Sequence, residues 1–309
     1  MNDITMNDLI GLLPYAPIIA VVITVLTVMI AITFKRSHMV TGTITVAGLN
    51  IGLFTLIGQM IGVIESGSIA PNAEQLFVID NFAQFNMVVI FICALACCTL
   101  SYAYLANLKD NKEELYLLML LSTIGALLMV SAQHMASFFM SLEMLSVPLY
   151  GLLAYTYMRN QSLESGLKYL VLSATASATL LMGMAFIYAE VGSLAFKPIS
   201  MVLGNIFESP LLILGAAMMM FGIAFKLSAA PFHMWTSVQM LLMVMATLSI
   251  LVGNLLAVRQ TSLKRLLGYS SIAHMGYVMI VIVSIGSAAD SISSMYMAVY
   301  AFTSIGAFG

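Results

Sequence analysis

Charged residues are scarce in this chain. Only 8% of the 309 residues are charged, and 61% are hydrophobic, whereas an ordinary soluble domain carries about 25% charged residues. The mean hydropathy of +1.04 excludes a water-soluble globular domain and indicates a protein that crosses a membrane several times. The net charge of -2 gives no basis for a nucleic-acid partner.

Cysteine and cofactor motifs are equally sparse. The three cysteines, Cys93, Cys97 and Cys98, lie within one apolar run, which favours packing roles over a disulfide framework or a metal site. The chain has no Gly-x-Gly-x-x-Gly fingerprint, no Walker loop and no Cys-x-x-Cys pair. We therefore expect no NAD, flavin, iron-sulfur or metal site in this chain, so any redox chemistry belongs to partners.

Long apolar runs fill most of the remaining sequence. A helix needs about 20 apolar residues to cross the hydrocarbon core, because lipid offers no partner to unpaired backbone groups. The pattern predicts an all-α, polytopic transmembrane helix bundle of about ten spans. These are expected at residues 9–34, 39–64, 81–105, 115–131, 136–157, 165–189, 211–230, 238–257, 266–284 and 292–309.

The basic residues indicate how the chain is oriented, because short loops rich in Lys and Arg stay in the cytoplasm. The N-terminal segment carries Asp3 and Asp8 and no basic residue, unlike a cleaved signal peptide, so the first run is expected to remain as a helix. Basic residues follow the first, third and fifth spans, and acidic residues collect in the loops between. The pattern predicts a multi-pass inner-membrane protein with a periplasmic N-terminus. The basic residues are Lys35, Arg36, Lys109, Lys112 and Arg159; the acidic ones are Glu65, Glu74, Asp80, Glu190 and Glu208.

The alternation of charge breaks in the last third of the chain. Continued from the N-terminus, it would place Arg259, Lys264 and Arg265 outside. An odd number of missing spans between Thr236 and Arg259 would restore the pattern; a basic loop on the unexpected side is the other possibility.

Five segments, in order along nearly the whole chain, resemble the antiporter-type proton-pumping subunits of respiratory complex I, and most closely the N-type members in bacterial NADH-quinone oxidoreductase. They are the runs Asp110-Asn-Lys-Glu-Glu-Leu-Tyr, Ser141-Leu-Glu-Met-Leu-Ser-Val-Pro-Leu, Leu163-Glu-Ser-Gly-Leu-Lys-Tyr, Phe225-Lys-Leu-Ser-Ala-Ala-Pro-Phe-His-Met-Trp-Thr and Leu263-Lys-Arg-Leu-Leu-Gly-Tyr-Ser-Ser-Ile-Ala-His-Met-Gly-Tyr.

The chain departs from that family in two places. After Thr236 the family continues with a Pro-Asp-Val-Tyr-Gln-Gly-like loop and a lysine-bearing helix, whereas this chain passes directly to Ser237. The family also has about 14 spans, and this chain stops inside an apolar run at Gly309. We expect residues 1–309 to form a single transmembrane antiporter-like domain that is incomplete, with a helix missing between residues 236 and 237.

Three charged residues inside apolar runs are the main candidates for chemistry. Removing a charge from water is costly unless the charge is paired or neutralised. We therefore expect Glu143, Lys168 and Lys226 to have a role beyond packing. The resemblance implies that Glu143 pairs with Lys168 and modulates its proton affinity, and that Lys226 is the central proton carrier. Lysine suits this role because its pKa moves readily on burial. A static ion pair that fixes packing, or for Lys168 a stem reaching interfacial water, is the alternative.

Three further residues are weaker candidates. His233 and His274 titrate near neutral pH and could relay protons, although packing histidines are common. Lys264 fits a cytoplasmic anchor and could also feed a proton path.

The resemblance implies a membrane-arm subunit that couples electron transfer from NADH to quinone, carried out in other subunits, to proton translocation. FMN, iron-sulfur clusters and quinone would then sit in partner subunits, and the direct partners would be other membrane-arm subunits and the lipid bilayer. A subunit of a multi-subunit sodium/proton antiporter, or a non-pumping fragment of either complex, is the alternative.

Overall fold

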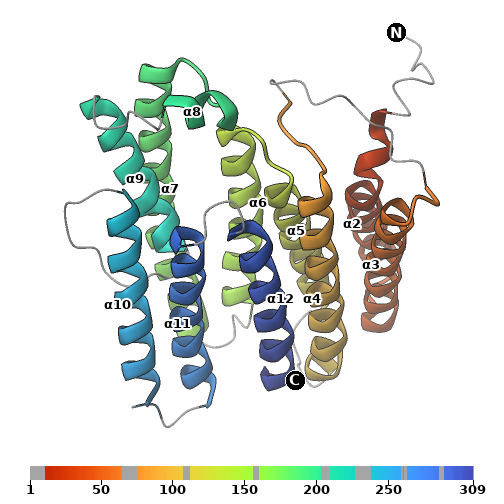
Figure 1. Ribbon diagram of the computed structural model, residues 1–309. Helices are drawn as coiled ribbons and strands as arrows, with labels where there is room; N and C mark the ends of the chain where they lie inside the picture. Colours follow the sequence, from red (N-terminus) through yellow and green to blue (C-terminus); the bar gives the residue numbers. More distant parts are fainter. Residues whose placement is uncertain are drawn as a thin grey trace. The chain divides into compact units, whose positions relative to one another are not determined.

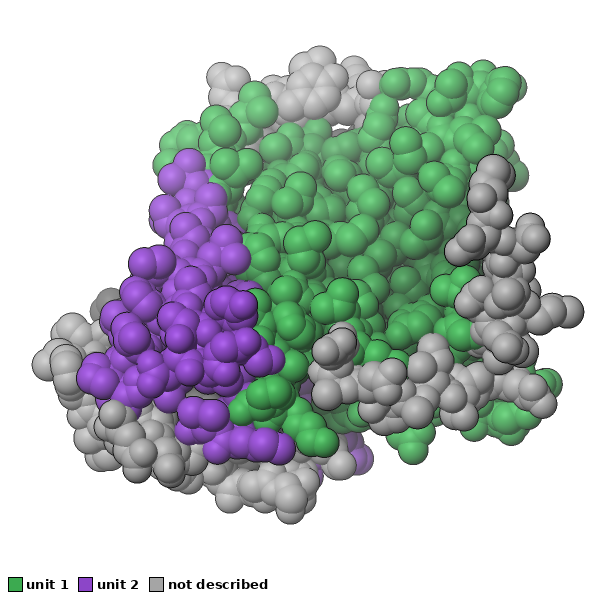
Figure 2. All heavy atoms as spheres, turned by 90° about the horizontal axis from the view of Figure 1, so that it is seen from above, with its two compact units in different colours: residues 1–170, 194–198, 309 green, residues 171–193, 199–308 purple. Residues whose placement is uncertain are grey.

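The computed structural model describes residues 11–64, 75–106, 112–155, 160–202, 209–226, 238–258, 260, 263–284 and 289–308. The chain forms two compact units (Figure 2). Unit 1 contains residues 1–170, 194–198 and 309, and unit 2 contains residues 171–193 and 199–308.

Unit 1 consists of neighbouring helices that run up and down (Figure 1). They are the short 3-10 helix η1 (Leu13–Tyr15), α2 (Ala16–Phe34), α3 (His38–Met60), α4 (Asn81–Ala106), α5 (Glu113–Val130), α6 (Met135–Ala154) and the first part of α7 (Asn160–Val191).

Unit 2 contains the rest of α7 and the helices that follow it. They are α8 (Phe196–Val202), whose first residues belong to unit 1, and α9 (Pro210–Lys226), α10 (Val238–Val258), α11 (Leu263–Ser284) and α12 (Ala289–Phe308). The helix α8 lies between the spans expected at residues 165–189 and 211–230.

The predicted all-α membrane bundle is confirmed. Within the described part of the chain, six helices are long and apolar enough to cross a membrane, from Leu13–Phe34 to Gly166–Val191, and shorter apolar helices lie at Pro210–Ile223 and Ser249–Val258. Many large side chains on these helices are exposed, among them Phe34, Phe54 and Leu255. Such an outward apolar surface is stable only against lipid or other apolar helices.

The core of unit 1 lies between α2, α3, α4 and α5. Fully buried aliphatic and aromatic side chains from all four helices meet there, including Val21, Leu49, Phe91 and Leu120. Glycines allow the close approach: a Cβ added at Gly48 would lie 2.0 Å from the Thr24 hydroxyl oxygen. Packing of small residues is the main attraction between helices when lipid removes the hydrophobic driving force.

Helices α5 and α6 approach each other backbone to backbone. A Cβ at Gly125 would lie 2.4 Å from the backbone nitrogen of Leu145, and the Ser122 hydroxyl donates a hydrogen bond of 3.5 Å to the Leu145 carbonyl. Gly125 therefore fixes the height and rotation of α6 at the turn that carries Glu143.

Extended backbone segments join the helices at one end of unit 1. The amide of Gln133 donates to the Leu76 carbonyl at 3.0 Å, and the amide of Met135 donates to the Leu194 carbonyl at 2.8 Å. The His134 ring caps α6 by accepting from the Ala136 amide at 3.2 Å. These bonds satisfy backbone groups where the helices end.

Unit 2 is held together by glycine contacts as well. A Cβ at Gly215 on α9 would lie 2.9 Å from the Gly183 carbonyl on α7, and a Cβ at Gly276 on α11 would lie 2.7 Å from the Ala246 carbonyl on α10. The backbones of these helix pairs are thus in direct contact.

We predict that Gly125→Leu destabilises the chain by about 1–3 kcal/mol, because the new side chain has to displace the α6 backbone. Thermal unfolding of the purified chain in detergent measures this as a lower midpoint. The matched control is Gly268→Leu, since a Cβ at Gly268 meets nothing within 4 Å. An equal midpoint for the two variants would contradict a structural role for the close contact between Gly125 and the α6 backbone.

Candidate functional site

Glu143 lies in the middle of α6 and is half-buried. The Ser141 and Ser146 side chains beside it are buried and donate to carbonyls of their own helix. Pro148 continues the helix but has no N–H group, so the Met144 carbonyl, four residues earlier, loses its helical donor. Glu143 therefore lies next to the point where Pro148 interrupts the backbone hydrogen bonds of α6.

Lys168 lies in the first part of α7 and is paired differently from the expectation. Its ammonium group forms a 2.5 Å ion pair with Glu164, one turn earlier on the same helix, and the two side chains are 71% and 64% exposed. In this structure Glu164, and not Glu143, is the charge partner of Lys168. The pair is local and exposed because the long lysine stem follows its own helix, as i,i+4 pairs do.

The start of α7 nevertheless packs against α6. The Tyr169 ring meets the Tyr150 ring edge-on, with centroids 5.4 Å apart, and a Cβ at Gly166 would lie 2.8 Å from the Ala154 side chain. The residue next to Lys168 is thus anchored to the helix that carries Glu143.

Lys226 is half-buried and is the last described residue of α9. A Cβ at Gly222, one turn earlier, would lie 2.8 Å from the Ala176 carbonyl of α7. The two helices run in opposite directions, so the face of α9 that packs on α7 continues from Gly222 to Lys226 at the level of Ser173. Ser173 is 2% exposed.

His274 on α11 is the centre of an aromatic cluster in unit 2. Its Nδ1 lies 2.6 Å from the Tyr296 hydroxyl of α12, and its ring lies 4.4 Å from the Tyr300 ring. Tyr277 contacts the same imidazole edge-on at 5.8 Å, and its hydroxyl accepts a 3.4 Å bond from the Asn254 side chain of α10. The cluster thus links α10, α11 and α12 through the hydroxyl groups of Tyr277 and Tyr296.

Two of the predicted site residues cannot be placed as side chains. His233 lies outside the described residues, and Lys264 lies on α11, but its side chain is not among the described ones. Among the described residues, no group of three His, Cys, Asp or Glu side chains is arranged to hold a metal ion.

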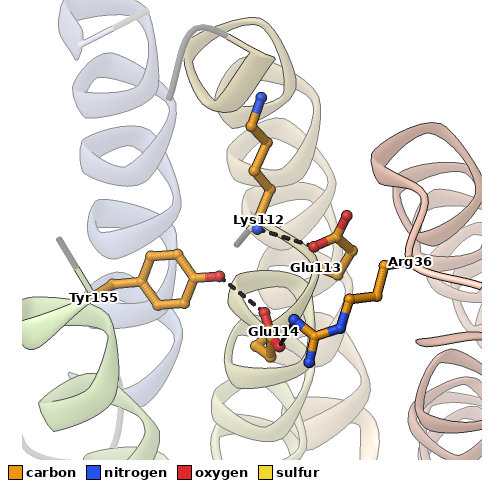
Figure 3. A network of polar contacts seen from close by, with 5 residues as sticks. All are labelled: Arg36, Lys112, Glu113, Glu114 and Tyr155. Atoms are coloured by element: carbon orange, nitrogen blue, oxygen red, sulfur yellow. Dashed lines mark hydrogen bonds and ion pairs between the residues drawn. The ribbon is translucent and has the colours of Figure 1, made fainter. Parts of the chain in front are cut away.

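The sequence reasoning missed a polar network at the end of unit 1 where the basic residues collect (Figure 3). Arg36, between α2 and α3, forms a 3.1 Å ion pair with Glu114 in the first turn of α5. The Tyr155 hydroxyl at the end of α6 donates to the other Glu114 oxygen at 3.4 Å. The signal was present as Glu113 and Glu114 opening an apolar run, the position that a helix dipole favours for acids.

Two features make this network a fixed connection. Burial raises the pKa of the Tyr155 phenol, and the neighbouring Glu114 carboxylate raises it further, so Tyr155 remains a hydrogen-bond donor. The buried Glu113 accepts from the Lys112 amide at 3.0 Å, while the Lys112 ammonium donates to the Ala106 carbonyl at the end of α4 at 2.8 Å. The ends of α4, α5 and α6 and the turn before α3 are thereby tied together.

The fold and these side chains define a class: an all-helical, multi-pass membrane protein with carboxylate, lysine and histidine side chains on its helices. Comparison with known proteins gives the family. The model of the NADH:quinone oxidoreductase/Mrp antiporter transmembrane family matches residues 132–240 and 236–309, and the chain belongs to that family.

Two bacterial relatives are similar over nearly the whole chain. The chain is 79% identical to NADH-quinone oxidoreductase subunit N of Psychrobacter arcticus, over all of the chain and 71% of the relative. It is 46% identical to subunit N of Acinetobacter baumannii, over 96% of the chain and 67% of the relative.

Solved structures have the same fold. A chain of respiratory complex I from Thermus thermophilus, solved with bound aureothin, is 28% identical with a TM-score of 0.74, over 94% of this chain and 68% of that one. A chain of the Mrp complex from a Dietzia species has a TM-score of 0.76 at 18% identity, over 95% of this chain and 63% of that one. The second likeness is one of fold alone.

We predict a weak coupling between Arg36 and Glu114. Both side chains are partly exposed, at 53% and 37%, and exposed ion pairs contribute about 0.2–1 kcal/mol. A double-mutant cycle with Arg36→Gln and Glu114→Gln, followed by unfolding in detergent, measures the coupling. A coupling above about 2 kcal/mol would mean that the pair acts as a buried one.

We predict that Tyr296→Phe moves the ¹⁵N resonance of the His274 Nδ1 atom, because the variant removes its 2.6 Å partner. Tyr300→Phe is the control: it removes a hydroxyl from the same cluster but keeps the ring that lies 4.4 Å from the imidazole. NMR of the chain labelled at histidine in detergent compares them. If both variants changed the ¹⁵N chemical shift of His274 Nδ1 equally, the contact with the Tyr296 hydroxyl would not be specific.

Proposed function

We propose that this chain is the N-type membrane-arm subunit of a bacterial NADH-quinone oxidoreductase and moves protons across the membrane when the complex transfers electrons. The observation that carries the proposal is the 79% identity, over the whole chain, to a relative named subunit N of that enzyme. The helical membrane bundle with charged side chains on its spans supplies the physical means.

The redox steps belong to other subunits in this proposal. NADH, FMN, the iron-sulfur clusters and quinone are reached only through the assembled complex, and the immediate partners are the neighbouring membrane-arm subunits and lipid. The likeness to a chain of respiratory complex I supports this assignment.

Glu143, Lys168 and Lys226 carry the proton transfer in this proposal. A lysine that moves between a carboxylate partner and an apolar surrounding changes its proton affinity, and so binds and releases a proton in turn. Lys168 is paired with Glu164 in this structure. A switch of Lys168 from Glu164 to Glu143 is the conformational step that the proposal requires.

His274, His233 and Lys264 extend this path. The Tyr296 hydroxyl, at 2.6 Å from His274, holds the ring in one orientation and offers it a proton donor or acceptor. A histidine so oriented can pass a proton between α11 and α12.

We also propose that a helix is missing between residues 236 and 237. The family match falls into two segments that meet at residues 236–240, and the match to the Psychrobacter relative runs over 349 residues, against 309 in this chain. The alternation of basic loops calls for an odd number of missing spans at the same place. The same distribution of basic residues supports a periplasmic N-terminus in an inner-membrane protein.

A sodium/proton antiporter subunit is the second candidate. The family includes Mrp antiporters, but the Mrp likeness is 18% in identity against 79% for the subunit N relative. The oxidoreductase assignment is therefore preferred.

We predict that Lys226→Ala, in the assembled complex that contains this chain, lowers proton uptake per quinone reduced at least tenfold, because the variant removes the amine that the proposal makes the central proton carrier. Glu143→Gln should reduce it as well, since it removes the carboxyl group to which Lys168 switches in the proposal. Proton uptake and quinone reduction are followed together in liposomes. Lys197→Gln, on the short helix α8, is the control. If Lys226→Ala took up as many protons per quinone reduced as this control does, the proposed role of Lys226 would be wrong.

We predict that inserting the corresponding residues of the Psychrobacter relative between residues 236 and 237 raises proton uptake several-fold over the chain as it stands, because the insertion restores the missing span. An insertion of equal length made of the same residues in scrambled order is the control. Equal uptake with and without the native segment would argue against an interrupted path.

A further inference from the structure

Aromatic rings from α3, α4 and α5 meet where α3 begins. The His38 ring of α3 stacks on the Tyr102 ring of α4, with centroids 4.4 Å apart, and its centroid lies 5.7 Å from that of the Tyr116 ring of α5. A Cβ at Gly42, one turn along α3, would lie 3.1 Å from the Tyr102 ring and 3.5 Å from the Tyr116 hydroxyl. The rings of His38 and Tyr116 are therefore neighbours beside a position of α3 that has no side chain.

The tautomer of His38 follows from its contact with α4. The Nε2 atom lies 3.2 Å from the Tyr102 carbonyl oxygen. Because a carbonyl oxygen can only accept, Nε2 carries the proton of the neutral ring, and Nδ1 keeps a lone pair. The Nδ1 atom is buried, so the ring presents an acceptor to the interior of unit 1.

Tyr116 brings a donor to the same place. Its side chain is only 1% exposed. Neither its hydroxyl nor the His38 Nδ1 atom has a hydrogen-bond partner among the described residues. A buried donor and a buried acceptor thus lie on neighbouring rings without a bond between them. Buried polar atoms of this kind normally have a partner, from the protein or from an ordered water molecule.

We propose that His38 and Tyr116 bind one water molecule between them. The Tyr116 hydroxyl donates to the water oxygen, and the water donates to the His38 Nδ1 atom. Water suits both atoms because it accepts and donates at once, whereas a cation would offer nothing to the hydroxyl hydrogen and an anion nothing to the Nδ1 lone pair. Buried waters typically bridge polar groups that have no other partner.

This water site adds to the polar contacts at the end of unit 1 where the basic residues collect. Arg36 and Glu114, which form an ion pair, stand two residues before His38 and Tyr116 respectively. The water therefore joins the start of α3 to α5 beside that pair. The site lies outside residues 132–309, which the family model matches, and it does not depend on the proposed function.

A cryo-electron microscopy map of the assembled complex that contains this chain, at a resolution that shows ordered water, tests the site directly. We expect a single peak within about 3.2 Å of both the Tyr116 hydroxyl and the His38 Nδ1 atom. Waters bonded to exposed carbonyls of the same helices are the internal reference. A direct bond between Tyr116 and His38, or an empty position where the reference waters are visible, would overturn the proposal.

Thermal unfolding of the full chain in detergent gives a second test, because the sign of the change is informative. Tyr116→Phe removes one of the two bonds that hold the water, so we expect the unfolding midpoint to fall by a few degrees. Tyr102→Phe is the matched control: it removes a hydroxyl from a ring that is 40% exposed and stacks on the same histidine, and it should leave the midpoint unchanged. An unchanged or higher midpoint for Tyr116→Phe would show that its hydroxyl has no partner, and the proposal would be wrong.

Discussion

The absence of hydrogen-bonding solvent inside a membrane governs this chain. Backbone groups within lipid have to bond within their own helix, and serine and threonine hydroxyls do the same here: Ser141, Ser146 and Thr123 all donate to carbonyls three or four residues earlier. Local satisfaction leaves few polar groups free to join one helix to another. Cohesion between helices therefore depends on close contact at small residues, which the backbone approaches at Gly125, Gly215 and Gly276 illustrate.

These contacts also position the charged residues. Gly125 holds α6 at Leu145, two residues from Glu143, and Gly222 holds α9 one turn before Lys226. Each candidate charge thus stands next to a turn that cannot shift without breaking a backbone contact. Such a rigid frame confines rearrangement to side chains, which suits an exchange of ion-pair partners better than a movement of whole helices.

Much of the fold could be predicted because apolar length is a strong signal. The observed α3 and α11 begin and end within a few residues of the expected runs. The pairing of Lys168 was not predicted, although Glu164 lies one turn earlier on the same helix, where an i,i+4 ion pair forms readily. Arg36 and Glu114 were missed for a different reason: 78 residues separate them in the sequence, and only the packing of α2, α3 and α5 brings them together.

The position of Lys226 on α9 determines which of its contacts an interruption after Thr236 would affect. The contacts that orient α9, at Gly183, Gly215 and Gly222, all precede Lys226 in the sequence, so they do not depend on any segment that follows. The local surroundings of Lys226 on the α7 side can therefore form whether or not a further span follows Thr236. Continuity of a proton path is a separate requirement, because it needs polar groups or water beyond the lysine at every step. A chain interrupted after Thr236 would therefore keep Lys226 in place on α9 and still lack the groups that the proposed path needs beyond it.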